Sequence, residues 1–228
     1  MRPTSGRVSG DETVKKKTAV IGITGGVGAG KSTVLDYIAD NYDALILKTD
    51  EIAHDVMEPG SDCYERLREI LPDEAFGRSL SGEETDRSID RQALARLLFA
   101  DDPLREEINA LVHPAVGEEL SAIVKKEKKQ NRLDYVIIES ALYTGGGFAL
   151  LCDEVWNVTA AENVRIDRLM KDRGYTRDKA VGIIESQAVN DRLSKTLSIQ
   201  IDNSADFDRT KEQIETELER VRQSGARS

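Results

Sequence analysis

Cysteine, aromatic residues and long apolar runs are all scarce in this 228-residue sequence. The two cysteines, Cys63 and Cys152, are far apart and lack the short spacing of a metal-binding pair. Such cysteines favour free thiols in a reducing compartment over a disulfide. No apolar run approaches the ~18 residues of a membrane helix, and the first residues lack the apolar core of a signal peptide. We therefore expect a cytoplasmic protein with no membrane partner.

Positively charged residues are also fewer than negatively charged ones. Lysine and arginine number 32 against 42 aspartates and glutamates, which gives a net charge of −10. Nucleic-acid partners require clustered cations, so the charge balance argues against such a partner. A small anionic ligand needs only one local basic pocket and stays compatible with this balance. The length suits one α/β domain with a subdomain, or two small domains.

One stretch of the chain has a strong motif. Residues Thr18–Thr33 read TAVIGITGGVGAGKST, an apolar strand that leads through glycines into a helix at Lys31. Gly25, Gly30, Lys31 and Ser32 fit the phosphate-binding pattern G-x-x-x-x-G-K-[ST]. Glycines let the backbone amides turn inward around phosphate oxygens, while Lys31 reaches the outer phosphates and Ser32 offers a hydroxyl to magnesium. The alternative to phosphate binding is a glycine-rich turn that only connects strand and helix.

The rest of the chain alternates between strand and helix patterns. Further strands are expected at 44–49, 134–142, 154–159 and 197–201, and helices at 91–99, 103–111, 114–129, 161–171, 177–189 and 206–221. This alternation predicts a five-stranded parallel sheet flanked by helices. The expected organisation is a flexible tail (1–17), a core (18–50 and 134–222), a helical insertion (about 51–130), a lid (about 165–190) and a C-terminal tail (223–228).

Two carboxylates follow predicted strands, where ligands of parallel sheets gather. Asp50 ends the second strand and either accepts a proton from an attacking hydroxyl or caps the following helix. Glu139 lies near the end of the third strand and either holds a magnesium-bound water or satisfies buried amides.

A cluster of five cations lies between Arg165 and Arg177 in this otherwise acidic chain. Arginines that close over a migrating phosphoryl group neutralise its charge and exclude water, and a turn at Gly174 suits a mobile lid. The alternative is an amphipathic helix with a charged outer face. His113, which precedes Pro114, is either a structural hydrogen-bonding residue or a base. The glycines at 145–147 either form a flexible connection or line the site.

Several segments together resemble the dephospho-CoA kinase family. They are ITGGVGAGKST, TDEIAHDVMEPG, DRQALARLLF, LVHP, RLMKDRGYTRDKAVGIIESQ and IDNSAD, and the resemblance runs from Ile21 to about Asn203. The phosphate loop alone is shared by many NTPases, whereas this combination is far more specific. The resemblance implies a P-loop kinase with an acceptor-binding helical subdomain and a lid, either a monomer or a weak homo-oligomer.

The implied reaction moves the terminal phosphoryl group of ATP to the ribose 3′-hydroxyl of dephospho-CoA, with Mg²⁺. The implied catalytic residues are Asp50 as the base, Lys31 and Arg168, and Ser32 is the implied metal ligand. The implied ATP-binding residues are Gly26, Val27, Gly28, Ala29, Gly30, Lys31, Ser32, Thr33, Arg173 and Asn203. The implied acceptor-binding residues are Asp50, His54, Arg91, His113 and Glu139.

The sequence departs from the family pattern at three places. Lys48 replaces the first aspartate of an Asp-x-Asp pair, Asp172 and Arg173 are inverted relative to the usual Arg-Asp, and residues 141–147 differ from the usual Pro-Leu-Leu-Phe-Glu. A one-residue shift moves a side chain about 100° around a helix, so the cation that faces ATP stays open. Two other functions also stay open: a P-loop kinase for a nucleoside or nucleotide, and an ATP-binding interaction protein without transfer activity.

Overall fold

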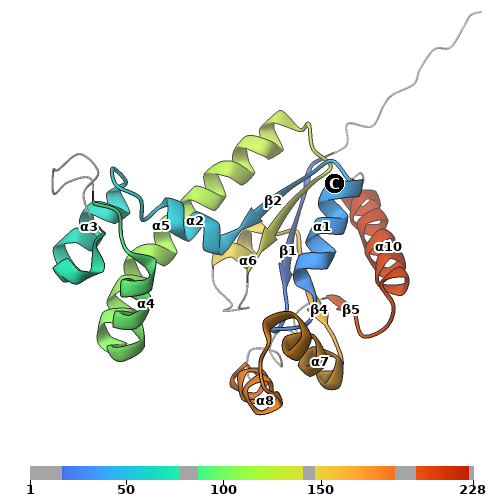
Figure 1. Ribbon diagram of the computed structural model, residues 1–228. Helices are drawn as coiled ribbons and strands as arrows, with labels where there is room; N and C mark the ends of the chain where they lie inside the picture. Colours follow the sequence, from blue (N-terminus) through green and yellow to red (C-terminus); the bar gives the residue numbers. More distant parts are fainter. Residues whose placement is uncertain (1–16, 78–86, 141–146, 188–198, 226–228) are drawn as a thin grey trace, which may run out of the picture.

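A parallel five-stranded sheet forms the centre of the molecule (Figure 1). The computed structural model describes residues 17–77, 87–140, 147–187 and 199–225. The strands are β1 (Ala19–Thr24), β2 (Ala44–Lys48), β3 (Tyr135–Glu139), β4 (Glu154–Thr159) and β5 (Ile199–Asp202). They lie in the order β2-β3-β1-β4-β5, and every neighbouring pair is parallel. The predicted five-stranded parallel sheet is confirmed.

Strand β1 occupies the middle of the sheet because all six of its residues are compatible with burial on both faces. Its sequence AVIGIT shows no polar alternation, and every residue in it is buried. Ile21 pairs with Ile137 of β3 on one side and with Glu154 of β4 on the other. The chain therefore leaves β1 at the point where neighbouring strands lie on both sides, which is where open parallel sheets bind ligands.

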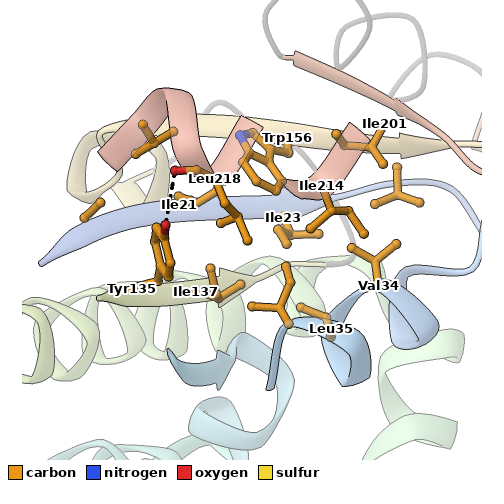
Figure 2. Close-up of a cluster of buried hydrophobic side chains, with 14 of the residues drawn as sticks. Ile21, Ile23, Val34, Leu35, Tyr135, Ile137, Trp156, Ile201, Ile214 and Leu218 are labelled. Atoms are coloured by element: carbon orange, nitrogen blue, oxygen red, sulfur yellow. Dashed lines mark hydrogen bonds between the residues drawn. The ribbon is translucent and has the colours of Figure 1, made fainter. Parts of the chain in front are cut away.

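Helices α1 (Lys31–Asn41) and α10 (Phe207–Gly225) cover one face of the sheet (Figure 2). Ile21, Trp156 and Ile214 are fully buried between them and the strands, and each such side chain contributes about 1.5–3 kcal/mol. The hydroxyl of Tyr135 donates a hydrogen bond of 3.1 Å to the carbonyl of Leu218, so its polar end is satisfied within the core. Helix α10 ends later than the sequence pattern indicated, at Gly225 instead of 221.

The opposite face is covered by α5 (Asp102–Gln130), α6 (Gly147–Leu151) and α2 (Thr49–Asp55). Leu120 and Val124 of α5 pack against Val136 and Ile138 of β3. Among the described helices none has the length and apolar character to cross a membrane, and this includes α5 with its 29 residues.

A separate helical region forms between β2 and β3, as the sequence predicted. It contains α2, α3 (Asp62–Ile70), a short 3₁₀ helix (Asp73–Ala75), α4 (Arg91–Ala100) and the first half of α5. Its own buried cluster includes Leu67, Leu94 and Ile108. Cys63 belongs to this cluster, and both cysteines are free thiols, as expected. Burial raises the pKa of the Cys152 thiol to about 12, so it stays protonated near neutral pH.

The expectation of two helices broken at Pro114 was wrong, because α5 runs through this residue without interruption. Pro114 lacks an N–H, and an internal proline costs a helix about 3 kcal/mol. The helix nevertheless continues because both halves are anchored. Val112 belongs to the cluster of the helical region, while Leu120 packs under the sheet. These burials outweigh the local cost.

Replacing Pro114 with alanine should therefore stabilise the protein. Pro114→Ala restores a donor for the carbonyl of Ala110 and removes the ring, and we expect the free energy of unfolding to rise by about 1–2 kcal/mol. Urea unfolding measures the change. Pro103→Ala is the matched control, because Pro103 lies in the first turn of the same helix, where proline is tolerated. A loss of stability in Pro114→Ala would show that α5 depends on this proline.

Two helices, α7 (Glu162–Arg173) and α8 (Arg177–Ser186), occupy most of the segment in which a lid is expected. They meet at Gly174, which has a left-handed φ of 64° and ends α7 as expected. Ile166 and Leu169 of α7 pack against Ala180 and Ile184 of α8. Helix α8 ends at Ser186, earlier than the predicted 189, and residues 188–190 of the predicted lid lie outside the described part. Of the expected glycine connection at 145–147, residues 145 and 146 also lie outside it, and Gly147 begins α6.

Candidate functional site

The loop from Gly25 to Gly30 connects β1 to α1 at the carboxyl edge of the sheet. Gly30 is the N-cap of α1 and has a left-handed φ of 90°. A Cβ at this position would lie 2.2 Å from Nδ2 of Asn203, and one at Gly25 would lie 2.3 Å from the carbonyl oxygen of Val158. The sequence attributed these glycines to the approach of phosphate. The structure adds a second reason, since the outer side of the loop packs directly on β4 and on Asn203.

A cavity of about 580 Å³, here called the loop cavity, lies beside this loop. It brings together most of the predicted ATP-binding residues: Gly26, Val27, Gly28, Gly30, Lys31, Ser32, Thr33, Arg173 and Asn203, and also Arg168. Ala29 lies behind the loop with 1% of its surface exposed. Gly25 of the phosphate-binding motif also lines the cavity, and the other lining residues, which were not predicted, are Leu169, Asp172, Gln187, Ala205 and Phe207. Both Asp172 and Arg173 line the cavity, so the inverted pair still places its cation at the site.

Lys31 is held in place by groups on the loop and on β3. Its Nζ donates a hydrogen bond of 2.8 Å to the carbonyl of Gly25 and lies 3.9 Å from the carboxylate of Glu139. Burial lowers the pKa of Lys31, while the carboxylates of Glu139 and Asp50 oppose that shift. A buried ammonium with few partners is well suited to bind an anion that replaces its lost hydration.

Two carboxylates, those of Glu139 and Asp50, interact electrostatically with Lys31. Glu139 ends β3 between Ile23 of β1 and Lys48 of β2, and burial raises the pKa of its carboxyl. Asp50 is the second residue of α2 and is exposed. The capping alternative for Asp50 was wrong, since the N-cap is Lys48. Within the described chain no hydrogen bond engages the Asp50 carboxylate, which leaves it free to accept a proton.

These groups also suit a magnesium ion. Among the described residues no cluster of three histidines, cysteines or carboxylates offers a complete protein cage. Mg²⁺ usually needs only one or two protein oxygens beside phosphates and water. The exposed hydroxyl of Ser32 in the loop cavity and the carboxylate of Glu139 are oxygen ligands of this kind.

Three side chains clamp the loop through hydrogen bonds to its carbonyl oxygens. Arg165, which is buried, donates through Nε to the carbonyl of Val27 at 2.8 Å. Arg168 donates to the carbonyls of Ala29 and Asn203 at 3.2 and 2.9 Å. Asn203, also buried, donates to Ala29 at 2.9 Å. The charged-outer-face alternative therefore fails for Arg165 and Arg168. Sequence reasoning missed the clamp, although the spacing of the two arginines places them on one face of α7.

A second cavity of about 230 Å³, the insertion cavity, lies between α2 and α4. It brings together His54 and Arg91, two of the predicted acceptor-binding residues, with apolar walls from Met57, Ile89, Leu94, Ala95 and Leu98 and with Glu58. His113 does not line it and lies at an exposed position of α5.

Lys48, the departure from the family pattern, has a partner on the next helix. Its Nζ forms a 2.8 Å ion pair with Glu51 in the first turn of α2, and both side chains are largely exposed. Because solvent screens such an exposed pair, it contributes little to stability. The pair turns the ammonium of Lys48 toward α2.

Comparisons with known proteins agree with this geometry. The family model for dephospho-CoA kinase matches residues 19–209. A dephospho-CoA kinase of Carboxydothermus hydrogenoformans is 31% identical over 88% of this chain and 93% of its own. Among solved structures, TT1252 from Thermus thermophilus has a TM-score of 0.67 at 25% identity and covers 90% of this chain and 98% of its own. A dephospho-CoA kinase from Campylobacter jejuni has a TM-score of 0.65 at 15% identity with the same coverages, which shows the common fold. The chain therefore belongs to the dephospho-CoA kinase family.

Proposed function

We propose that this protein phosphorylates the ribose 3′-hydroxyl of dephospho-CoA with ATP, which yields coenzyme A and ADP. The supporting observation is that Lys31 and Ser32 line the loop cavity, while the carboxylates of Asp50 and Glu139 interact electrostatically with Lys31. A triphosphate in the cavity would then have its reactive end next to a carboxylate. Membership of the family supplies the identity of the acceptor.

The proposed reaction assigns a role to each of these residues. The acceptor oxygen forms a bond to the terminal phosphorus, the bond from that phosphorus to the bridging oxygen of ADP breaks, and Asp50 takes the hydroxyl proton. Lys31 and Arg173 neutralise the charge that spreads over the migrating group. Arg168 acts by holding the carbonyl of Ala29, which orients the loop amides, and Asn203, which directly follows β5, does the same.

Magnesium is the proposed cofactor. When bound, it would supply positive charge that offsets the negative charge of the phosphates. Ser32 and Glu139 are the residues that would hold it, Ser32 through its hydroxyl and Glu139 directly or through a water.

The insertion cavity is the proposed acceptor site. Arg91 and His54 offer donors for the phosphates or ribose of dephospho-CoA, and the apolar walls suit its pantetheine arm. His113 is a weaker candidate, because its exposed position lies outside the lining of this cavity. The enzyme would act in the cytoplasm as a monomer or a weak homo-oligomer.

A coupled assay of ADP release tests the proposed function. We expect rapid release with dephospho-CoA and release near background with cytidylate, uridine and shikimate. Activity only with one of the other acceptors would indicate a different small-molecule kinase. ATP binding without release on any acceptor would indicate an interaction protein.

A further inference from the structure

Gln187 lies at the end of the second lid helix and reaches across to the phosphate loop. It is the C-cap residue of α8, and its Oε1 accepts a 2.8 Å hydrogen bond from the backbone N–H of Val27. The two residues are 160 positions apart in the sequence. Gln187 also lines the loop cavity, together with Lys31, Ser32 and Arg173.

The position of Gln187 is fixed by packing around Val27. The side chain of Val27 packs against the cluster of Ile166, Leu169, Ala180 and Ile184 that joins α7 to α8. Its carbonyl accepts from Arg165 at 2.8 Å and its N–H donates to Gln187. Arg165 of α7 and Gln187 at the end of α8 therefore bind the carbonyl and the N–H of Val27. Because Val27 lines the loop cavity, its N–H holds the side chain of Gln187 at the cavity wall.

The hydrogen bond to Val27 determines which end of the carboxamide is available. A backbone N–H can only donate, so the oxygen of Gln187 must face Val27 and the NH₂ group must face elsewhere. Within the described part of the chain Nε2 has no acceptor. An unused donor on the wall of a cavity with Lys31 and Arg173 is chemically matched to an anionic oxygen.

The position of Lys31 indicates which part of a nucleotide would meet this donor. A lysine of this motif reaches the outer phosphates, and Nζ of Lys31 lies 2.8 Å from the carbonyl of Gly25, at the start of the loop. The outer phosphates should therefore lie over the first half of the loop, where Val27 and Gln187 also lie. The inner phosphates should lie closer to the amides at the start of α1.

The geometry points to Gln187 as a further nucleotide-binding residue, whose Nε2 donates to an oxygen of the terminal phosphoryl group while its Oε1 holds Val27. The same side chain thus links the lid helices to the loop and to the group that is transferred. This inference rests on the proposed function, because it takes ATP as the ligand of the loop cavity.

Calorimetric titration of ATP and ADP, with magnesium and without acceptor, tests the inference. Gln187→Glu keeps an acceptor for Val27 and replaces the donor with a negative oxygen. We expect its affinity for ATP to fall at least about ten-fold and its affinity for ADP to change less than about three-fold. Gln187→Met, which adds no charge, should show a smaller loss in the same direction. Gln130→Glu, an exposed position at the end of α5, is the matched charge control and should bind both nucleotides as the wild type does.

The possible outcomes separate this inference from the proposed function. Equal losses for ATP and ADP, or wild-type affinities in both Gln187 variants, would overturn the role of Gln187 while leaving the kinase assignment intact. In a third outcome, the midpoint of thermal unfolding changes but the ratio of ATP affinity to ADP affinity stays at the wild-type value. This result would assign Gln187 a structural role only and would also overturn the inference. The Gln187 variants could lose more affinity for ATP than for ADP while the wild type does not phosphorylate dephospho-CoA. That result would uphold the role of Gln187 and overturn the proposed acceptor. A wild type that binds no ATP would overturn both.

Discussion

Asp50→Asn is expected to reduce kcat by about 10²–10⁴-fold while the affinity for ATP stays within a few-fold of the wild type. The asparagine keeps the size and polarity of the side chain but cannot accept the proton of the acceptor hydroxyl. Asp50 is exposed and no hydrogen bond engages its carboxylate within the described chain, so the fold should tolerate the change. Steady-state kinetics with dephospho-CoA, together with calorimetric ATP binding, separate the two effects.

Asp55→Asn is the matched control for Asp50→Asn. Asp55 is also exposed and ends the same helix, α2, so the substitution removes the same charge from the same element. We expect its kcat to remain within two-fold of the wild type. Unchanged turnover in Asp50→Asn would remove Asp50 from the role of base and leave Glu139 as the next carboxylate to test.

Lys31→Ala is expected to weaken ATP binding by about 100-fold or more. The ammonium is mostly buried, hydrogen-bonded to Gly25 and 3.9 Å from Glu139, and its removal leaves the outer phosphates without their charged partner. Glu139 also loses its neighbouring cation, so Lys31 no longer offsets the charge of this carboxylate beside the phosphates. Isothermal calorimetry measures the loss directly.

Lys126→Ala provides the control for Lys31→Ala, since Lys126 is exposed on α5 and its removal changes the net charge by the same amount. The control should bind ATP as the wild type does, and Lys31→Ala should retain the wild-type urea midpoint within a small margin. Normal ATP affinity in Lys31→Ala would contradict the assignment of the loop.

The elements that follow from short stretches of sequence were predictable. The apolar run of β1, the glycines of the loop and the start of α1 at Lys31 all lie within Thr18–Thr33, and each has a local physical cause. Gly174 ends α7 for a similarly local reason. The family resemblance then extended the prediction to His54 and Arg91, which the structure brings into one cavity.

What could not be predicted depends on contacts between distant segments. Arg165 and Gln187 meet the loop from 138 and 160 residues away, and no local pattern states which backbone group each will contact. At Pro114, contacts between distant segments made a prediction from local sequence wrong. Its local signal to break a helix is strong, but the packing of Val112 on one side and Leu120 on the other overrides it.

A crystal structure with a non-hydrolysable ATP analogue, magnesium and dephospho-CoA tests the central claim most directly. The account predicts that the triphosphate lies in the loop cavity against Lys31 and Ser32, with the ribose 3′-oxygen of the acceptor within about 2.6–3.2 Å of the Asp50 carboxylate. A triphosphate bound elsewhere, or an acceptor hydroxyl well out of reach of Asp50, would contradict it.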